Sequence, residues 1–109
     1  MATFLRTKIE KEIGTTAVTL LHPVGNSRYT VIGCNVANVT DYDVTIDATM
    51  VDPSSNEVYF IKQLIIPPYN SAKLITNGEK LVIAEECMFK IVSDTTSGVD
   101  VIISYAEIV

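Results

Sequence analysis

The last third of the chain runs from Ile66-Pro67-Pro68-Tyr69-Asn70-Ser71, through Asn77-Gly78-Glu79-Lys80-Leu81, to Val101-Ile102-Ile103-Ser104-Tyr105-Ala106-Glu107-Ile108. Apolar and polar residues alternate along it, and turn-forming residues interrupt it at short intervals. Alternation with a period of two is typical of strands that bury one face, and clusters of proline, glycine and asparagine end such strands. The stretch therefore predicts an antiparallel β-sandwich.

The same pattern extends back towards the N-terminus. Val44, Ile46 and Ala48 alternate with polar residues, which predicts a strand with one buried and one solvated face. The expected strands span residues 15–21, 28–39, 42–51, 57–66, 71–76, 80–84, 88–93 and 99–108. About eight short strands without a long helical pattern predict an all-β fold, an antiparallel β-sandwich of jelly-roll or immunoglobulin-like type.

Two expectations concern individual strand positions. The alternation places Ile32, Cys34 and Val36 on one face of their strand and Val31 on the other. Gly33 within this strand predicts a bulge or the close approach of a neighbouring segment. The residues expected in the core include Ile46, Phe89, Ile91 and Ile102.

The N-terminal residues fit two patterns. Leu5, Ile9 and Ile13 are four positions apart, as on one face of a helix, whereas the whole segment also alternates loosely, as in a strand. We interpret residues 1–14 as an N-terminal arm or first strand and residues 15–109 as a single β-sandwich domain. A chain of 109 residues has room for one core.

Composition and charge argue against two classes of partner. Apolar residues make up 48% of the chain and the net charge is −5. Nucleic acid is not an expected partner, because binding it requires Lys and Arg to neutralise phosphates and only eight are present. A membrane is not expected either, because no run approaches the ~20 apolar residues of a spanning helix.

The N-terminal sequence has no basic region followed by a long apolar stretch, so no signal peptide is expected. The protein would then act in the cytosol or leave the cell by lysis.

The sequence lacks the residue combinations that catalysis requires. His22 is the one histidine, and it directly precedes Pro23 in an expected loop. A hydrolase triad needs a base near a nucleophile and a third group that orients the base. No motif of this kind is present, so we expect no enzymatic activity, no catalytic residue and no cofactor.

Four carboxylates, Asp41, Asp43, Asp47 and Asp52, lie close together in the sequence. A glycosidase would need two carboxylates across a cleft, and an EF-hand would need a defined loop spacing that is absent here. We interpret these residues as turn acids and outward-facing strand acids, and we expect no metal site.

Cys34 and Cys87 both lie in apolar, strand-like runs. We expect two reduced core thiols, with a bridge between two strands as the alternative.

Exposed apolar residues are the candidates for a binding surface. The run Leu64-Ile65-Ile66 and the five tyrosines offer more apolar surface than a thin sandwich can bury. Tyrosines could pack at strand ends, contact a partner or stack on a sugar, although the absence of Trp weakens the sugar alternative. The predicted interface residues are Phe4, Leu5, Ile9, Tyr59, Ile65 and Tyr69.

Several segments along nearly the whole chain resemble small virion structural proteins of tailed bacteriophages. These are Gly14-Thr15-Thr16, the turn at Pro23, Val31-Ile32-Gly33, Ala37-Asn38-Val39-Thr40, Ile66-Pro67-Pro68, residues 78–83, Phe89-Lys90-Ile91 and residues 99–108. One departure is Cys87, which follows Glu85-Glu86 where a turn of the Gly-Asp kind is expected.

The resemblance implies a virion protein that is made in the host cytoplasm and has no catalytic residue. Its expected role is a capsid decoration (cement) protein, with a neck or tail accessory protein, or a receptor- or carbohydrate-binding module of a tail fibre, as alternatives. The implied partners are other phage virion proteins, namely major capsid or tail proteins. The implied state is a homo-oligomer, with a trimer suggested by analogy with decoration proteins.

Overall fold

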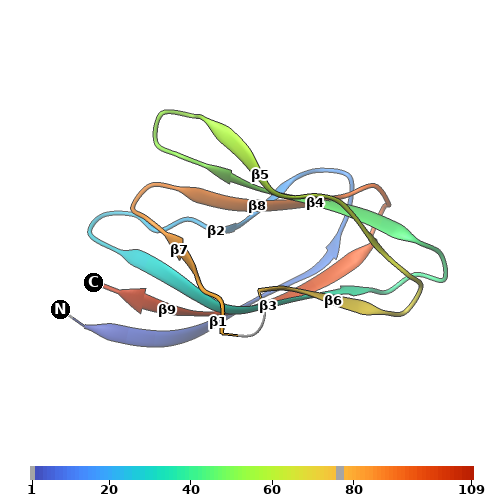
Figure 1. Ribbon diagram of the computed structural model, residues 1–109, viewed down its shortest axis with the longest axis horizontal. Helices are drawn as coiled ribbons and strands as arrows, with labels where there is room; N and C mark the ends of the chain where they lie inside the picture. The colour runs from blue at the N-terminus through green and yellow to red at the C-terminus, as the bar shows by residue number, and fades with distance from the viewer. Residues whose placement is uncertain (1, 76–77) are drawn as a thin grey trace.

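The computed structural model describes residues 2–75 and 78–109, and these residues form strands and no helices (Figure 1). The strands are β1 (Thr3–Ile13), β2 (Val18–Leu21), β3 (Arg28–Asn38), β4 (Val44–Val51), β5 (Glu57–Ile66), β6 (Ser71–Ile75), β7 (Leu81–Ile83), β8 (Met88–Ser93) and β9 (Val99–Ile108). They form two antiparallel sheets packed face to face, so the predicted all-β sandwich is confirmed.

The strand order distinguishes the two predicted sandwich types. The first sheet has the order β1-β9-β3-β6, with β7 paired to another part of β3, and the second has the order β2-β8-β4-β5. The pairs β1–β9, β2–β8, β3–β6 and β4–β5 are those of one long hairpin rolled onto itself. This is the jelly roll, whereas an immunoglobulin sheet places its first strand beside its second.

The predicted strand segments agree closely with the observed strands. The bounds of β5, β8 and β9 are those predicted, and the other predicted segments each contain one strand. The N-terminal segment is strand β1, which pairs with β9 of its own chain rather than extending away as an arm. Asn77, in the tight turn predicted at Asn77-Gly78, lies outside the described residues, whereas Gly78 has a φ of 79°.

The core lies between the sheets and includes most of the residues predicted for it. Ile46, Phe89 and Ile91 are buried as expected. The prediction for Ile102 is wrong: its side chain is 51% exposed, and its neighbour Ile103 is buried instead. The run Val101-Ile102-Ile103 is apolar on both faces, so alternation does not reveal which residue points inward.

The bulge predicted at Gly33 is confirmed, and it changes the face assignment of β3. The register with β9 shifts between Val31 and Gly33. Val31 and Cys34 are both buried, whereas Ile32 points outward, so the predicted grouping of Ile32 with Cys34 is wrong. The extra residue of a bulge interrupts the alternation, which explains the error. Among the residues that the structure describes, none has an atom within 4 Å of a Cβ built on Gly33, so no described segment approaches it closely.

The two cysteines are free and differ in environment. Cys34 is buried in β3, and this burial raises the pKa of its thiol to about 12. Cys87 is half-buried just before β8. The expected core thiol is therefore found at Cys34, whereas Cys87 lies at the margin of the core. Glu86, beside it, has a φ of 65°, a conformation that a glycine would adopt more readily.

Candidate functional site

The predicted interface residues are all exposed, but they lie on two sheets. Phe4, Leu5 and Ile9 lie on β1 at the edge of the first sheet. Tyr59 and Ile65 lie on β5 at the edge of the second sheet. Tyr69 follows β5, in the connection to β6. The structure therefore gives two candidate surfaces, one on the outside of each sheet. Phe4 belongs to neither, because it points to the inner side of β1, where Arg6 lies over its ring.

The outside of the first sheet carries an aliphatic surface. Leu5 is 79% exposed and Ile9 is 68% exposed, and Ile9 lies directly opposite Ile102 of β9. Ile32 of β3 and Val82 of β7 are also exposed. Sequence reasoning missed the last three because it assigned Ile102 and Ile32 to buried faces and did not single out Val82.

A hollow on the same face extends this surface across β3. It has a volume of about 570 Å³ and is lined by Ile32, Gly33, Cys34, Asn35, Lys73, Ile75, Ile102 and Ser104. The Asn35 Oδ1 atom is buried and has no hydrogen-bond partner within residues 2–75 and 78–109. The missing side chain at Gly33 leaves this part of the sheet open.

Between Phe4 and Glu10 the inner side of β1 carries three charged residues, Arg6, Lys8 and Glu10, and no core residue. The Arg6 Nε atom lies 2.6 Å from an oxygen of Glu107, and this hydrogen bond raises the pKa of Arg6. Lys8 and Glu10 form a looser pair at 3.6 Å. The edge strand therefore presents the charged groups of Arg6, Lys8 and Glu10 on one side and the aliphatic groups of Leu5 and Ile9 on the other.

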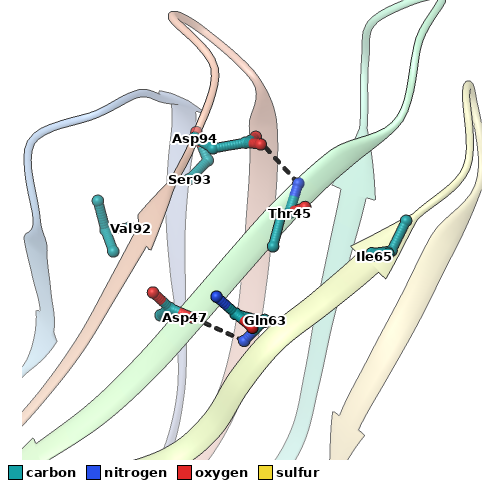
Figure 2. A pocket seen from close by; sticks show the side chains of 7 residues that line it. All are labelled: Thr45, Asp47, Gln63, Ile65, Val92, Ser93 and Asp94. Carbon is teal, nitrogen blue, oxygen red and sulfur yellow. Dashed lines mark hydrogen bonds between the residues drawn. The ribbon is translucent and has the colours of Figure 1, made fainter.

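The outside of the second sheet has a hollow of about 410 Å³ next to Ile65 (Figure 2). Two aspartates point into it. The backbone N–H of Gln63 donates to Asp47 Oδ1 at 2.7 Å, and the backbone N–H of Thr45 donates to Asp94 Oδ1 at 3.0 Å. Gln63 has a φ of 54°, so Asp47 satisfies the N–H of a bulged residue of β5.

Both carboxylates hold the backbone, and Asp94 is poorly suited to donate a proton. The hydrogen bond from the Thr45 N–H holds the pKa of Asp94 below its usual range. Asp94 is therefore ionised at neutral pH, whereas a glycosidase acid needs a raised pKa. The hollow is therefore suited to binding a polar group, and the hydrogen bonds to the two aspartates hold the backbone around it in place.

A second hollow on this face surrounds Tyr59 and has a volume of about 380 Å³. Thr49 donates to Glu57 at 2.7 Å beside it, and Lys90 lines its wall. The Lys62 ammonium lies 4.1 Å from the centre of the Tyr59 ring and covers one ring face. Tyr59 is therefore an exposed aromatic group with a cation against it.

The remaining candidate groups occupy separate positions. His22 is exposed after β2, with its Nε2 atom 3.9 Å from Glu86. Asp52 accepts hydrogen bonds from the backbone of Asn56 and Ser54, which lower its pKa and close the β4–β5 turn.

Across residues 2–75 and 78–109 there is no group of three or more His, Cys, Asp or Glu side chains able to hold a metal ion. In the same ranges no helix is long and apolar enough to cross a membrane.

Comparison with known proteins gives a likeness of fold only. No family model matches the sequence, and no curated protein matches it. A chain from Bacillus endospore appendages, described as a novel family of disulfide-linked pili, is 10% identical with a TM-score of 0.53, covering 96% of this chain and 85% of that one. A chain in the structure of infectious bursal disease virus, Gt strain, is 11% identical with a TM-score of 0.51, covering 97% of this chain and 32% of that one.

Proposed function

We propose that the chain is a non-enzymatic structural subunit of a tailed-phage virion, and that it is a capsid decoration (cement) protein that oligomerises and stabilises the particle by surface contacts. The exposure of large aliphatic side chains on both outer faces carries this proposal. Leu5, Ile9 and Ile102 are exposed on one sheet and Ile65 on the other. Grouped apolar residues on a small domain typically mark a surface that another protein covers.

The likeness of fold supports this proposal in a limited way. A fold does not by itself determine a function. A similar fold does, however, occur in a chain of the endospore appendages described as pili and in a chain of a virus. The proposed partners are the major capsid or tail proteins of the same virion, and the proposed state is a homo-oligomer, with a trimer as the form that the resemblance suggests.

Copy number in the purified particle tests the proposal. Quantitative mass spectrometry should find the protein in hundreds of copies per particle if it decorates the shell. A few copies per particle would contradict the decoration role and assign the chain to the neck, tail or fibre. Its absence from washed particles would contradict any virion role.

A receptor- or carbohydrate-binding module of a tail fibre is the second candidate. The hollow beside Tyr59 favours it, because an exposed aromatic ring with Glu57 and Lys90 nearby can stack on a sugar and bind its hydroxyls. A glycan array distinguishes the two functions. Glycan binding that Tyr59→Ala abolishes would support a carbohydrate-binding fibre module, and no binding to any glycan would exclude that carbohydrate-binding function.

A further inference from the structure

The free side of β1 is an unpaired edge from Thr3 to the bulge at Glu12. β1 pairs with β9 on one side, and no other strand of residues 2–75 and 78–109 pairs with it. Its backbone N–H and C=O groups on the other side are therefore available to a further strand. Exposed edges of this kind bind extended segments by adding a strand to the sheet.

The charges along this edge change sign around Ile9. Lys8 and Glu10 lie opposite the buried residues Ile103 and Val101, so both point to the inner side of the sheet. Their side chains remain 43% and 32% exposed, so the second sheet does not cover them. Ile9 points to the outer side, opposite the exposed Ile102.

We propose that two copies of this chain associate by antiparallel pairing of β1 with β1, about a two-fold axis that passes through Ile9. Lys8 of each copy then faces Glu10 of the other, and Ile9 faces Ile9. The two five-stranded sheets become one continuous sheet. This inference rests on the proposed function and deepens it, because it names a second copy as the partner and β1 as the contact.

Charge complementarity selects this register over its neighbours. Centring the pairing on Thr7 sets Arg6 against Lys8. Centring it on Lys8 opposes two lysines, although Arg6 then faces Glu10, and centring it on Glu10 opposes two glutamates, although Lys8 then faces Glu12. Like charges directly opposite each other destabilise a strand pair. Charges on an edge strand also discourage indiscriminate pairing. Of the registers compared, the one centred on Ile9 combines attractive pairs with no like-charge pair.

Apolar contacts follow the same register. The pairing produces a row of four isoleucines across the dimer, from Ile102 and Ile9 of one copy to Ile9 and Ile102 of the other. These side chains are 51% and 68% exposed in one chain, so the row removes apolar surface from water. The bulge at Glu12, whose φ is 55° and whose N–H is bound to Asp100, limits the pairing to the residues before it.

This contact leaves the second sheet free. Two-fold contacts use the same patch on both copies, as β1 does here. The three-fold association suggested by the resemblance would need another surface, and the exposed Tyr59 and Ile65 lie on the other sheet.

Charge exchange across the axis tests the proposal. Lys8→Glu and Glu10→Lys each replace two attractive pairs with two repulsive ones, so each should weaken the dimer about tenfold or more in sedimentation equilibrium at low salt. The double variant Lys8→Glu/Glu10→Lys restores both attractive pairs at the original net charge of −5 and should dimerise like the wild type. A mixture of the two single variants should form the heterodimer.

Exposed charges away from β1 serve as matched controls. Lys80→Glu and Glu85→Lys make the same changes in net charge and should leave the dissociation constant unchanged. Thermal melts of each variant show whether the fold is retained. A cross-link gives a second readout: in a Cys87→Ser background, Ile9→Cys brings two Cβ atoms to about 5 Å and should form a disulfide, whereas Thr7→Cys leaves its two copies about 13 Å apart and should not.

The possible outcomes separate this inference from the proposed function. If the wild type self-associates but the double variant fails to recover the loss, or if Ile9→Cys does not cross-link, the β1 contact is wrong while the structural role stands. If the wild type stays monomeric up to millimolar concentration but binds particles, this contact is again wrong. If it neither self-associates nor binds particles, both proposals fail.

Discussion

Asn38 is a buried polar side chain that joins three parts of the sandwich. It is 3% exposed, and its Nδ2 atom donates to the carbonyls of Tyr42, Ile66 and Pro67 at 2.8, 2.9 and 3.1 Å. Its Oδ1 atom accepts from the backbone N–H and the hydroxyl of Thr40. The end of β3 is thereby attached to the start of β4 and the end of β5.

Asn38→Ala should lower the free energy of unfolding by about 2–3 kcal/mol, because it leaves buried carbonyls without a donor. Urea unfolding measures the change. Asn70→Ala is the matched control: Asn70 is exposed and makes one side-chain hydrogen bond, so its loss should cost less than about 0.5 kcal/mol. Equal stability of the two variants would contradict the role assigned to Asn38.

The ionisation of Asp94 makes the free energy of unfolding depend on pH in the acid range. Its pKa in the folded state lies below the value of about 3.9 in the unfolded chain, chiefly because of the Thr45 N–H. The contribution of Asp94 to stability is therefore complete at pH values above its pKa in the unfolded chain. It is lost as the pH falls through its pKa in the folded protein. Asp94→Asn should be less stable than the wild type near neutral pH, and the difference should shrink as the pH falls below the unfolded value and through the lower folded pKa. A difference that stays constant from neutral to acid pH would contradict this account.

At the scale of the strand, the loss of stability on substitution depends on whether the side chain lies on the buried face of the sheet. Phe89 is fully buried in β8 and its ring meets Phe60 edge-on with centroids 5.8 Å apart. Phe89→Ala should cost roughly 3–5 kcal/mol, whereas Ile102→Ala on the outer face of β9 should cost less than about 1 kcal/mol. Chemical denaturation of both variants tests the strand assignment, and a comparable loss at Ile102 would show that its face is covered within one chain.

The buried face of a strand could be predicted wherever the other face is polar. The prediction was wrong where both faces are apolar or where a bulge interrupts the alternation. Ile46 lies in a strand that alternates cleanly, and its burial follows directly from the pattern. Ile102 lies in a run with apolar residues on both faces, and Ile32 lies beside a bulge. In these two places burial depends on pairing with distant strands, which local alternation does not contain.

The sequence was enough to predict which residues of the candidate surfaces are exposed. It was not enough to predict how these residues are distributed over the two sheets. Leu5, Ile9, Tyr59 and Ile65 are exposed, in keeping with an interface, but only the topology shows that the first two lie on a different sheet from the others. The edge formed by β1 depends on its pairing with β9, at the opposite end of the chain. Long-range pairing of this kind leaves no trace in the local pattern of β1.

As a whole molecule, the protein is a thin sandwich that measures 45 × 27 × 21 Å. Both termini lie at the same end, where Ala2 and Val109 exchange backbone hydrogen bonds of 3.0 and 2.9 Å (Figure 1). Its two outer faces each carry exposed aliphatic residues. Weak contacts through such faces become strong when symmetry repeats them, which suits a subunit present in many copies.

Adding the purified protein back to particles assembled without it is the most direct test of the structural role. We expect saturable binding of hundreds of copies per particle, measured by quantitative mass spectrometry after washing, and a higher temperature of particle rupture. Leu5→Asp and Ile9→Asp should reduce both, since they place charge on the exposed aliphatic surface. Particles that bind none of the wild-type protein and rupture at an unchanged temperature would contradict the account.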